Sequence, residues 1–419
     1  MKLRTVFTSL TLAVFAVVAN AQMPQMPQMP NAPGLLATTQ ARAFLDQDPS
    51  VATARAGLEV ARQEASILGQ SPYEWIARGS TQRRNVTAVG RFNEWSVGVE
   101  RGLRLPGKGA ADRQIGEAVL GEARARYGEA MHSSARELMA SWLDWLAAEQ
   151  AYALAQASLV SIQDNLTAVD KRVKAGDASK LDANLARSEL AEQRRLENDA
   201  KTQAAAAWAR LSARFPGFPK DRIALPLPAA LDQNDGFWQQ RILSESDELK
   251  IAQAQLARAE AQSARDRADR LPDPTLGVYT ASESGGREKI TGLTISIPLP
   301  GGVRQSRGAK SVAAQEAANQ ALELKRRQLE TAIAGELATA RGTFESLQIA
   351  TDGAKGMQEN ARLTQRAYSL GEGDLQTLLL ARRQASAAAN SALQAQVAAL
   401  KAWYGLLVDA HLIWDLDKD

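Results

Sequence analysis

The sequence predicts a mainly α-helical protein with a small β part, built from a duplicated helix–strand–strand–helix–helix unit. The duplication is visible in two motifs. Leu103-Arg-Leu-Pro-Gly-Lys-Gly109 recurs as Ile297-Pro-Leu-Pro-Gly-Gly-Val303, an offset of 194 residues. Val173-Lys-Ala-Gly-Asp-Ala-Ser179 is answered by Tyr368-Ser-Leu-Gly-Glu-Gly-Asp374, with an offset of 195 between the central glycines. Solenoid repeats run to roughly 20–50 residues, so each copy is a large unit of its own.

Residues 1–21 have the features of a secretory signal peptide. Lys2 and Arg4 precede an apolar stretch, and Ala19-Asn20-Ala21 supplies the small-x-small cleavage pattern. The apolar stretch is shorter than the roughly 20 residues that a spanning helix needs. Residues 22–34 follow as a Met/Pro/Gln-rich flexible segment of Gln-Met-Pro triplets. Methionines can bind soft metals, but the favoured interpretation of this segment is a flexible spacer. The signal peptide predicts an exported protein.

Composition excludes several classes of function. Lys and Arg number 50 against 47 Asp and Glu, a formal charge of +3, and the two signs are interspersed, so no nucleic-acid surface is expected. The chain has no Cys and only two histidines, His132 and His411, so neither disulfides nor a zinc or copper site are expected. No Walker loop, zincin helix or serine-nucleophile elbow occurs. We therefore predict no catalytic residue, no cofactor, no bound metal and no enzyme activity.

The first repeat is expected over residues 35–215. A helical segment at 35–69 is followed, after two strands, by a proline-free stretch at 109–175 and a shorter helix at 180–215. A helix of that length would extend roughly 100 Å. Apolar residues along it alternate steps of three and four, which is typical of coiled-coil packing. This seam consists of Trp145, Ala148, Tyr152, Ala155, Leu159, Ile162, Leu166, Val169 and Val173.

The second repeat is expected over residues 244–414, after a linker at 216–243, and a tail at 415–419 follows it. Its helices are predicted at 244–270, 303–370 and 375–410, and part of its seam is Ile333, Leu337, Ala340, Phe344 and Leu347. In each copy the two shorter helices, placed end to end, match the length of the long one. We therefore expect them to stack beside it and to form a thin-walled helical tunnel.

Four strands are expected, at 73–82, 94–105, 275–281 and 290–299, because the periodicity changes there from 3.6 to 2. Each strand would have one apolar and one polar face, which fits either a half-buried sheet of a soluble protein or a membrane barrel with a water-filled lumen. Four strands cannot close a barrel, since bacterial barrels begin at about eight, whereas three protomers would supply twelve. The corners where strands pass into helices are expected at Pro106 and Gly107, and at Pro300 and Gly301, because proline ends a ladder and glycine permits a bend.

These features together resemble the TolC-type outer membrane efflux family, over about Leu35 to Trp414. The resemblance is carried by the duplicated layout, the Pro-Gly corners, the tip glycines Gly176 and Gly371 and the Tyr368-x-x-Gly371 approach to the second tip. The Leu-Pro-Gly-Lys form of the first corner and the Ala175-Gly-Asp177 tip are most similar to the CzcC-like heavy-metal branch. The resemblance implies a homotrimer with a twelve-stranded barrel in the outer membrane lipid of a Gram-negative bacterium and a helical tunnel in the periplasm.

The resemblance also implies partners. Family members are passive ducts that dock a periplasmic adaptor and an inner-membrane pump, here expected to be of the resistance-nodulation-division type. The adaptor meets the helix-turn tips, which in this chain contain Gly176, Asp177, Gly371, Glu372 and Asp374. The family's tip leucine is replaced by Asp177 and Glu372, which suggests a more polar contact.

The resemblance further suggests a ring of carboxylates about six residues beyond each tip glycine. Asp182 fits from the first copy, but Thr377 occupies the equivalent place in the second, and Leu380 stands where another acid is frequent. Carboxylate rings favour cations, whereas Asp and Glu also occur simply as helix-start residues. Both interpretations stay open for Asp182.

The predicted function is an outer-membrane channel that conducts divalent heavy-metal cations from an adaptor and pump to the exterior. A duct for multidrug efflux or type I protein secretion is an open alternative. A periplasmic adaptor is a third possibility, but it should show a single helical hairpin flanked by split β domains, whereas here the helices come twice.

Overall fold

The computed structural model describes residues 35–221, 224–414 and 416. The predicted signal peptide and the Met/Pro/Gln-rich segment lie outside these residues, as does the predicted tail apart from Leu416. The fold is mainly helical with one small sheet, as the sequence predicted. None of the helices within the described ranges combines the length and apolarity of a membrane-crossing helix.

Each repeat begins with two helices where the sequence suggested one. In the first repeat these are α1 (Thr38–Gln47) and α2 (Pro49–Gly69). The break falls at Asp48, because a residue before proline avoids the helical region and takes φ −64° and ψ 129° here. The Asp48 carboxylate then caps α2, since it accepts a hydrogen bond from the backbone N–H of Ser50 at 2.7 Å.

The second repeat breaks at the corresponding place. Helix α5 (Asp235–Glu245) and helix α6 (Asp247–Ala268) meet at Ser246, whose hydroxyl accepts a hydrogen bond from the N–H of Leu249 at 3.2 Å. Helix α5 occupies the segment that the sequence assigned to a linker. It begins with a second cap, because the side chain of Asn234 accepts a hydrogen bond from the N–H of Phe237 at 2.8 Å.

The long helices are α3 (Lys108–Ala175, 68 residues) and α7 (Gly302–Leu370, 69 residues), each followed by a 35-residue helix, α4 (Lys180–Arg214) or α8 (Leu375–Asp409). In α7, four of the five predicted seam residues are buried: Ile333, Leu337, Ala340 and Leu347. In α3 the seam residues Trp145, Ile162 and Val169 are buried. The other six predicted seam residues of α3 are half-buried, so the heptad pattern identified the packed face of α7 and only part of that of α3.

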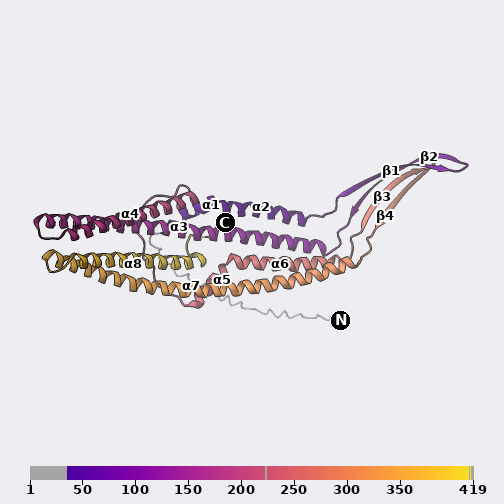
Figure 1. Ribbon diagram of the computed structural model, residues 1–419. Coiled ribbons are helices and arrows are strands. Elements are labelled where there is room, and N and C mark those ends of the chain that lie inside the picture. Colours follow the sequence, from indigo (N-terminus) through magenta and orange to yellow (C-terminus); the bar gives the residue numbers. More distant parts are fainter. Residues whose placement is uncertain (1–34, 222–223, 415, 417–419) are drawn as a thin grey trace, which may run out of the picture. The chain divides into compact units, whose positions relative to one another are not determined.

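Helix α3 is the centre of the packing (Figure 1), since it contacts α2, α6, α4 and α8. Toward its start, Ile115 and Val119 form a cluster with Ala61 of α2 and Ala261 of α6. Alanines at these positions let the helices approach closely. Larger side chains fill the middle, and the fully buried ones on α3 are Met131, Leu138, Leu143, Trp142 and Trp145.

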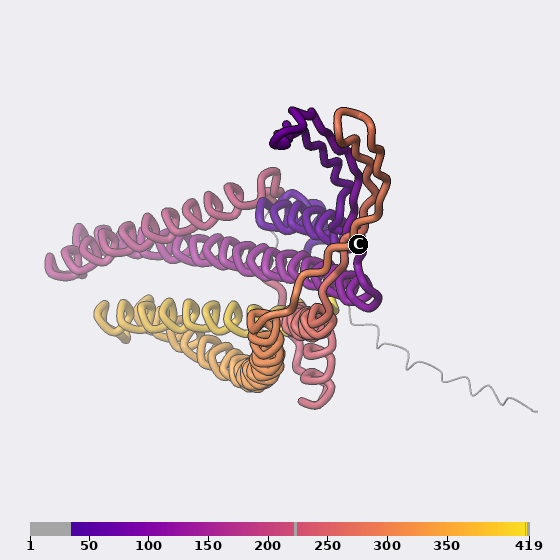
Figure 2. Tube along the Cα trace, turned by 90° about the vertical axis from the view of Figure 1, so that its right-hand side faces the viewer, coloured from indigo at the N-terminus to yellow at the C-terminus, as the bar shows by residue number. Residues whose placement is uncertain are grey.

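The four strands form one antiparallel sheet in the order β1-β2-β3-β4 (Figure 2), and the two repeats meet at the β2–β3 pair. The strands are β1 (Trp75–Val86), β2 (Gly90–Gly102), β3 (Thr275–Glu283) and β4 (Glu288–Ser296), with a 3₁₀ turn at Ser284–Gly286. Stepping straight across the ladder from Trp75 leads to Arg101, then Leu276, then Ile295. These opposed residues lie on one face of the sheet.

The strands differ from the sequence expectation at their ends. Strand β1 continues to Val86 and β2 starts at Gly90, so the polar residues assigned to a link belong to the ladder, where Arg83 is opposite Asn93. Strand β4 stops at Ser296 and not at 299, because Pro298 has no N–H to donate. Apolar side chains on one face are exposed, and they include Trp75, Val97, Val99, Val278, Leu293 and Ile295.

Candidate functional site

The two long helices end in the same turn. At the end of α3, the N–H of Gly176 donates to the carbonyl oxygen of Val173 at 3.1 Å. The N–H of Asp177 donates to the carbonyl oxygen of Arg172 at 2.8 Å. At the end of α7, Gly371 and Glu372 make the matching pair of bonds, at 3.1 and 2.9 Å. This Schellman motif needs a left-handed residue, and Gly176 and Gly371 have φ of 84° and 80°.

The helices that leave the tips are capped by residues predicted for the site. Ser179 and Asp182 form a capping box, in which the Asp182 carboxylate accepts from the N–H of Ser179 at 3.0 Å. In the second copy, Asp374 accepts from the N–H of Thr377 at 2.8 Å and from its hydroxyl at 2.8 Å. Hydrogen bonds from Thr377 hold the pKa of Asp374 below its ordinary value. Both carboxylates therefore have a structural role, and both remain accessible to water.

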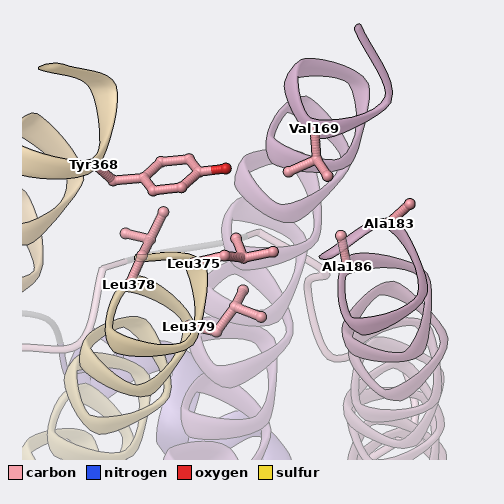
Figure 3. Close-up of a cluster of buried hydrophobic side chains, with 7 residues drawn as sticks. All are labelled: Val169, Ala183, Ala186, Tyr368, Leu375, Leu378 and Leu379. Carbon is pink, nitrogen blue, oxygen red and sulfur yellow. The ribbon is translucent and has the colours of Figure 1, made fainter. Parts of the chain in front are cut away.

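A buried apolar cluster joins the two helical hairpins next to these tips (Figure 3). Tyr368 of α7 lies toward Val169 of α3. The guanidinium carbon of Arg172 is 5.1 Å from the centre of the Tyr368 ring, a cation–π contact. The cluster links all four helices and consists of Val169, Ala183, Ala186, Tyr368, Leu375, Leu378 and Leu379. The structure thus brings the two predicted tips into one unit.

A pair of equivalent arginines shows how the hairpins differ. Arg187 and Arg382 are separated by 195 residues, the same offset as the tip glycines. Arg187 of α4 forms an ion pair with Asp170 of α3 at 2.9 Å, inside its own hairpin. In the second hairpin, the position equivalent to Asp170 is occupied by Gln365 of α7. Arg382 of α8 therefore meets a neutral amide there and not a carboxylate.

Arg382 instead connects the hairpins. Its guanidinium donates to the side-chain oxygen of Gln365 on α7 and, at 3.2 Å, to the backbone carbonyl of Ser161 on α3. Burial lowers the pKa of Arg382 below its ordinary value. It lines a cavity of about 710 Å³ between the hairpins, together with Ser158, Glu189 and Gln358. The sequence analysis did not single out Arg382. The signal that could have done so is its separation of 195 residues from Arg187, the same as between the tip glycines.

The surface around the tips is mixed in character. Asp177, Glu372, Asp374 and Thr377 are exposed and Asp182 is half-buried. The other exposed side chains include the large apolar residues Leu181, Leu370 and Leu380 and the basic residues Lys174 and Lys180. Exposed leucines beside carboxylates suit a protein partner better than a small substrate. Within the described ranges, no cluster of His, Asp or Glu has the geometry to bind a metal ion.

The strand-to-helix corners are not equivalent. Gly107, the residue before the first of α3, has φ 92°, a conformation that favours glycine. Gly301 precedes α7 with φ −123° and ψ 178°, which any residue adopts, so its backbone does not need glycine as the sequence suggested. Pro106 and Pro300 both lie beyond the last ladder pair of their strand.

A chain of charges supports the first corner. Lys108 is 1% exposed, and its ammonium lies between the carboxylates of Asp269 and Asp273. Arg265 bridges Asp269 to Asp112, which also pairs with Arg104. At the position of the second corner equivalent to Lys108 stands Gly302, so the second corner lacks the lysine at the centre of this network.

The two histidines, far apart in sequence, are adjacent in the fold. Their ring centres lie 5.5 Å apart in an edge-to-face arrangement, and His132 Nε2 is 2.8 Å from a carboxylate oxygen of Asp409. This contact ties the middle of α3 to the end of α8. The two rings therefore pack against each other, His132 half-buried and His411 buried.

Comparison with known proteins identifies the family. The sequence profile described as "Outer membrane efflux protein" matches residues 41–214 and 238–407, which span most of both repeats, and the chain belongs to that family. It is accordingly an outer-membrane efflux protein and not an enzyme, as predicted. No curated protein sequence matches the chain.

Solved structures share the fold at low sequence identity. The chain is similar to CusC, with 18% identity, a TM-score of 0.74 and coverage of 89% of this chain and 91% of that one. The MtrE outer membrane channel of Neisseria gonorrhoeae gives 20% identity, a TM-score of 0.69 and coverage of 89% and 88%. The CmeC outer membrane channel of Campylobacter jejuni gives 14% identity, a TM-score of 0.72 and coverage of 91% and 87%.

Proposed function

We propose that the chain forms, as a homotrimer, the outer-membrane duct of a tripartite efflux system, and that its cargo is divalent heavy-metal cations. The single observation that carries the duct is the pair of matched helical hairpins, joined at their tips and attached to an amphipathic four-stranded sheet. The sheet exposes an apolar face, as a lipid-facing surface requires. Three copies would supply twelve strands.

The tips are proposed to dock the periplasmic adaptor, which in turn connects to an inner-membrane pump of the resistance-nodulation-division type. Gly176 and Gly371 set the turns, while Asp177, Glu372 and Asp374 present carboxylates beside Leu181 and Leu370. Such a surface fits an adaptor segment that carries basic and apolar side chains. Because an exposed ion pair contributes little to affinity, we expect the leucines to supply most of the binding free energy.

The heavy-metal cargo is supported by the position of Asp182 beyond the first tip and by the likeness of the first corner and first tip to the CzcC-like branch. Asp182 of three copies would form a ring of carboxylates, which favours cation passage. Thr377 stands at the equivalent position of the second repeat and contributes no charge.

The ring can be tested without disturbing the fold. In Asp182→Asn the side-chain oxygen still accepts the bond from Ser179, so α4 keeps its cap while the charge is lost. In planar bilayers, we expect the purified trimer with this change to lose part of its preference for cations over anions. Thr377→Asp is the converse variant, which adds a carboxylate at the equivalent position of the second repeat, and it should strengthen the preference for cations. Unchanged selectivity in both variants would reduce Asp182 to a capping residue.

The cargo is tested by growth of a deletion strain on zinc, cobalt, cadmium, nickel, copper and silver salts and on a panel of dyes, antibiotics and detergents. Hypersensitivity confined to divalent cations, restored by the intact gene, is the expected result. Sensitivity to dyes and antibiotics would move the function to multidrug efflux. Retention of a secreted protein in the cells would indicate type I secretion.

A further inference from the structure

The face of the sheet that carries the exposed apolar side chains changes character along its length. Opposed residues of a ladder share a face, and the straight path from Trp75 to Ile295 identifies this outward face. Both hairpin turns lie at the end of the sheet away from the helices (Figure 1). Because the helical part is periplasmic, the turns mark the exterior end of the strands.

Three exposed basic side chains lie on the outward face toward that exterior end, and we call them the outward cations: Arg83 of β1, Arg91 of β2 and Lys289 of β4. Lys289 stands opposite Ser282, which stands opposite the exposed Trp95, so all three share one ladder row. Arg83 and Arg91 lie beyond this row, closer to the turn. Tryptophan is enriched at membrane–water interfaces, which places the outward cations at the level of the lipid headgroups.

The spacing of charges along β2 agrees with this height. Arg91 and Arg101 are the charged residues on its outward face, ten positions apart. At about 3.4 Å per residue and a tilt of about 40°, they are separated by about 26 Å across the membrane, close to the height of about 25 Å of an apolar band. Arg101 is engaged within the chain, since it donates to the carbonyl oxygen of Tyr73 at 3.1 Å and lies 5.4 Å from the ring centre of Trp75.

The carboxylates at the exterior end lie on the opposite face of the sheet. The register places Glu94, Glu283 and Glu288 there. Glu94 is 3% exposed and forms an ion pair with Arg84 of the same face at 2.9 Å. Among the residues that the structure describes, none of the outward cations forms an ion pair, and Arg83 donates only to the neutral side chain of Asn93, at 3.2 Å.

The two arginines are also close to each other. Arg83 stands opposite Asn93, and Arg91 is two positions along β2 from Asn93, so the arginines are diagonal neighbours, roughly 7–8 Å apart. Like charges at this separation repel each other unless an anion lies between them. Guanidinium groups suit phosphate, because their planar N–H groups bind two of its oxygens at once. Lys289 adds a third positive charge on the same face.

We propose that the outward cations bind the phosphate groups of an anionic lipid in the outer leaflet of the outer membrane. This inference rests on the proposed barrel, which makes the apolar face of the sheet the lipid-facing one. The cations adjoin exposed apolar side chains such as Val97 and Leu293. One lipid molecule can therefore place its acyl chains on the apolar surface and its phosphates on the cations, which a free phosphate ion cannot do.

The proposal is tested by titrating the purified trimer, in a nonionic detergent, with lipid A that carries two phosphates. Arg83→Gln, Arg91→Gln and Lys289→Gln are combined in one variant, the outward variant. The matched control combines three changes that remove the same charge from exposed positions of α3 and α4: Lys171→Gln, Arg194→Gln and Lys201→Gln. A basic residue near an anionic lipid surface strengthens binding about fivefold.

We expect the outward variant to bind lipid A on the order of a hundredfold more weakly than wild type and the control to bind it like wild type. Equal affinity of wild type and the outward variant would overturn the proposal. Undiminished binding of lipid A stripped of both phosphates would also overturn it. Inorganic phosphate that binds wild type as tightly as lipid A does would assign the surface to a free anion. A wild-type protein that is monomeric and soluble without detergent would instead refute the barrel itself.

Discussion

The ammonium of Lys108 lies 2.8 Å from a carboxylate oxygen of Asp273, and both side chains are almost completely shielded from water. The two residues come from different repeats. Asp273 also accepts the hydroxyl of Tyr73 at 2.6 Å and the N–H of Leu105 at 2.9 Å. One carboxylate therefore fixes the entry to β1, the exit from β2 and the entry to β3 relative to the start of α3.

Replacing Lys108 by Met should destabilise the protein by about 3 kcal/mol or more, because it leaves Asp273 buried without its cation. Lys355→Met is the matched control, since Lys355 pairs with Asp352 at the surface, where the two side chains are 72% and 79% exposed. Such surface pairs contribute little to stability. Thermal unfolding in detergent, followed by circular dichroism, compares the two variants. Equal shifts in midpoint would show that the corner network contributes no more than a surface pair.

Replacing Gly371 by Ala should strain the tip turn by about 1–2 kcal/mol, because a left-handed backbone is unfavourable for any residue with a Cβ. The φ of Gly371 is 80°, and the new methyl group would meet no neighbouring atom, so the backbone is the sole source of strain.

A bulky residue at Gly371 or Gly176 should abolish efflux while insertion into the outer membrane is retained. Gly353→Ala, inside α7, should leave efflux unchanged. Loss of insertion in the tip variants would mean that these glycines serve folding.

Replacing Arg382 by Gln should loosen the contact between the hairpins, because Arg382 donates to both α3 and α7. Arg187→Gln is the matched control, since Arg187 bonds only within its own hairpin in the described contacts. We expect a larger single-channel conductance for the Arg382 variant and a nearly unchanged one for the Arg187 variant. Similar conductance in both would argue against a connecting role for Arg382.

Replacing Asp409 by Asn should destabilise the protein at neutral pH by about 1–3 kcal/mol. Burial acts to raise the pKa of Asp409, but hydrogen bonds from His132 and Arg136 outweigh it, so the pKa lies below the ordinary 3.8. A lowered pKa in the folded state stabilises the fold above the ordinary pKa and loses this effect as pH falls through the folded value. The difference between wild type and variant should therefore shrink in unfolding measurements below pH 3.8. A difference that is independent of pH would contradict the charged role.

The long helices could be predicted from the sequence because their seams persist for many turns. The breaks at Asp48 and Ser246 could not be predicted with the same pattern, because apolar periodicity continues across them. The Asp48-Pro49 pair was the available local signal for the first break. Strand ends were misplaced where charged residues such as Arg83 continue the ladder, since side-chain polarity does not stop backbone pairing.

The tip turns could be predicted because glycines at the ends of long helices have one main structural use. The contacts of Arg382 and Lys108 could not, since each depends on a residue far away along the chain. Arg382 donates to the carbonyl of Ser161, 221 positions distant, and Lys108 donates to that of Leu271, 163 positions distant. The capping roles of Asp182 and Asp374 were visible in the Ser-x-x-Asp and Asp-x-x-Thr spacings. Their contribution to cation passage stays a prediction.

The exchange of Asp170 for Gln365 between the repeats has a consequence for symmetry. The first hairpin holds its arginine internally, while the second gives its arginine to the first hairpin of the same chain. A ring of three such chains contains six hairpins of two alternating kinds. The ring of tips would then have threefold and not sixfold symmetry in its contacts, and any movement of its mouth would keep that threefold pattern.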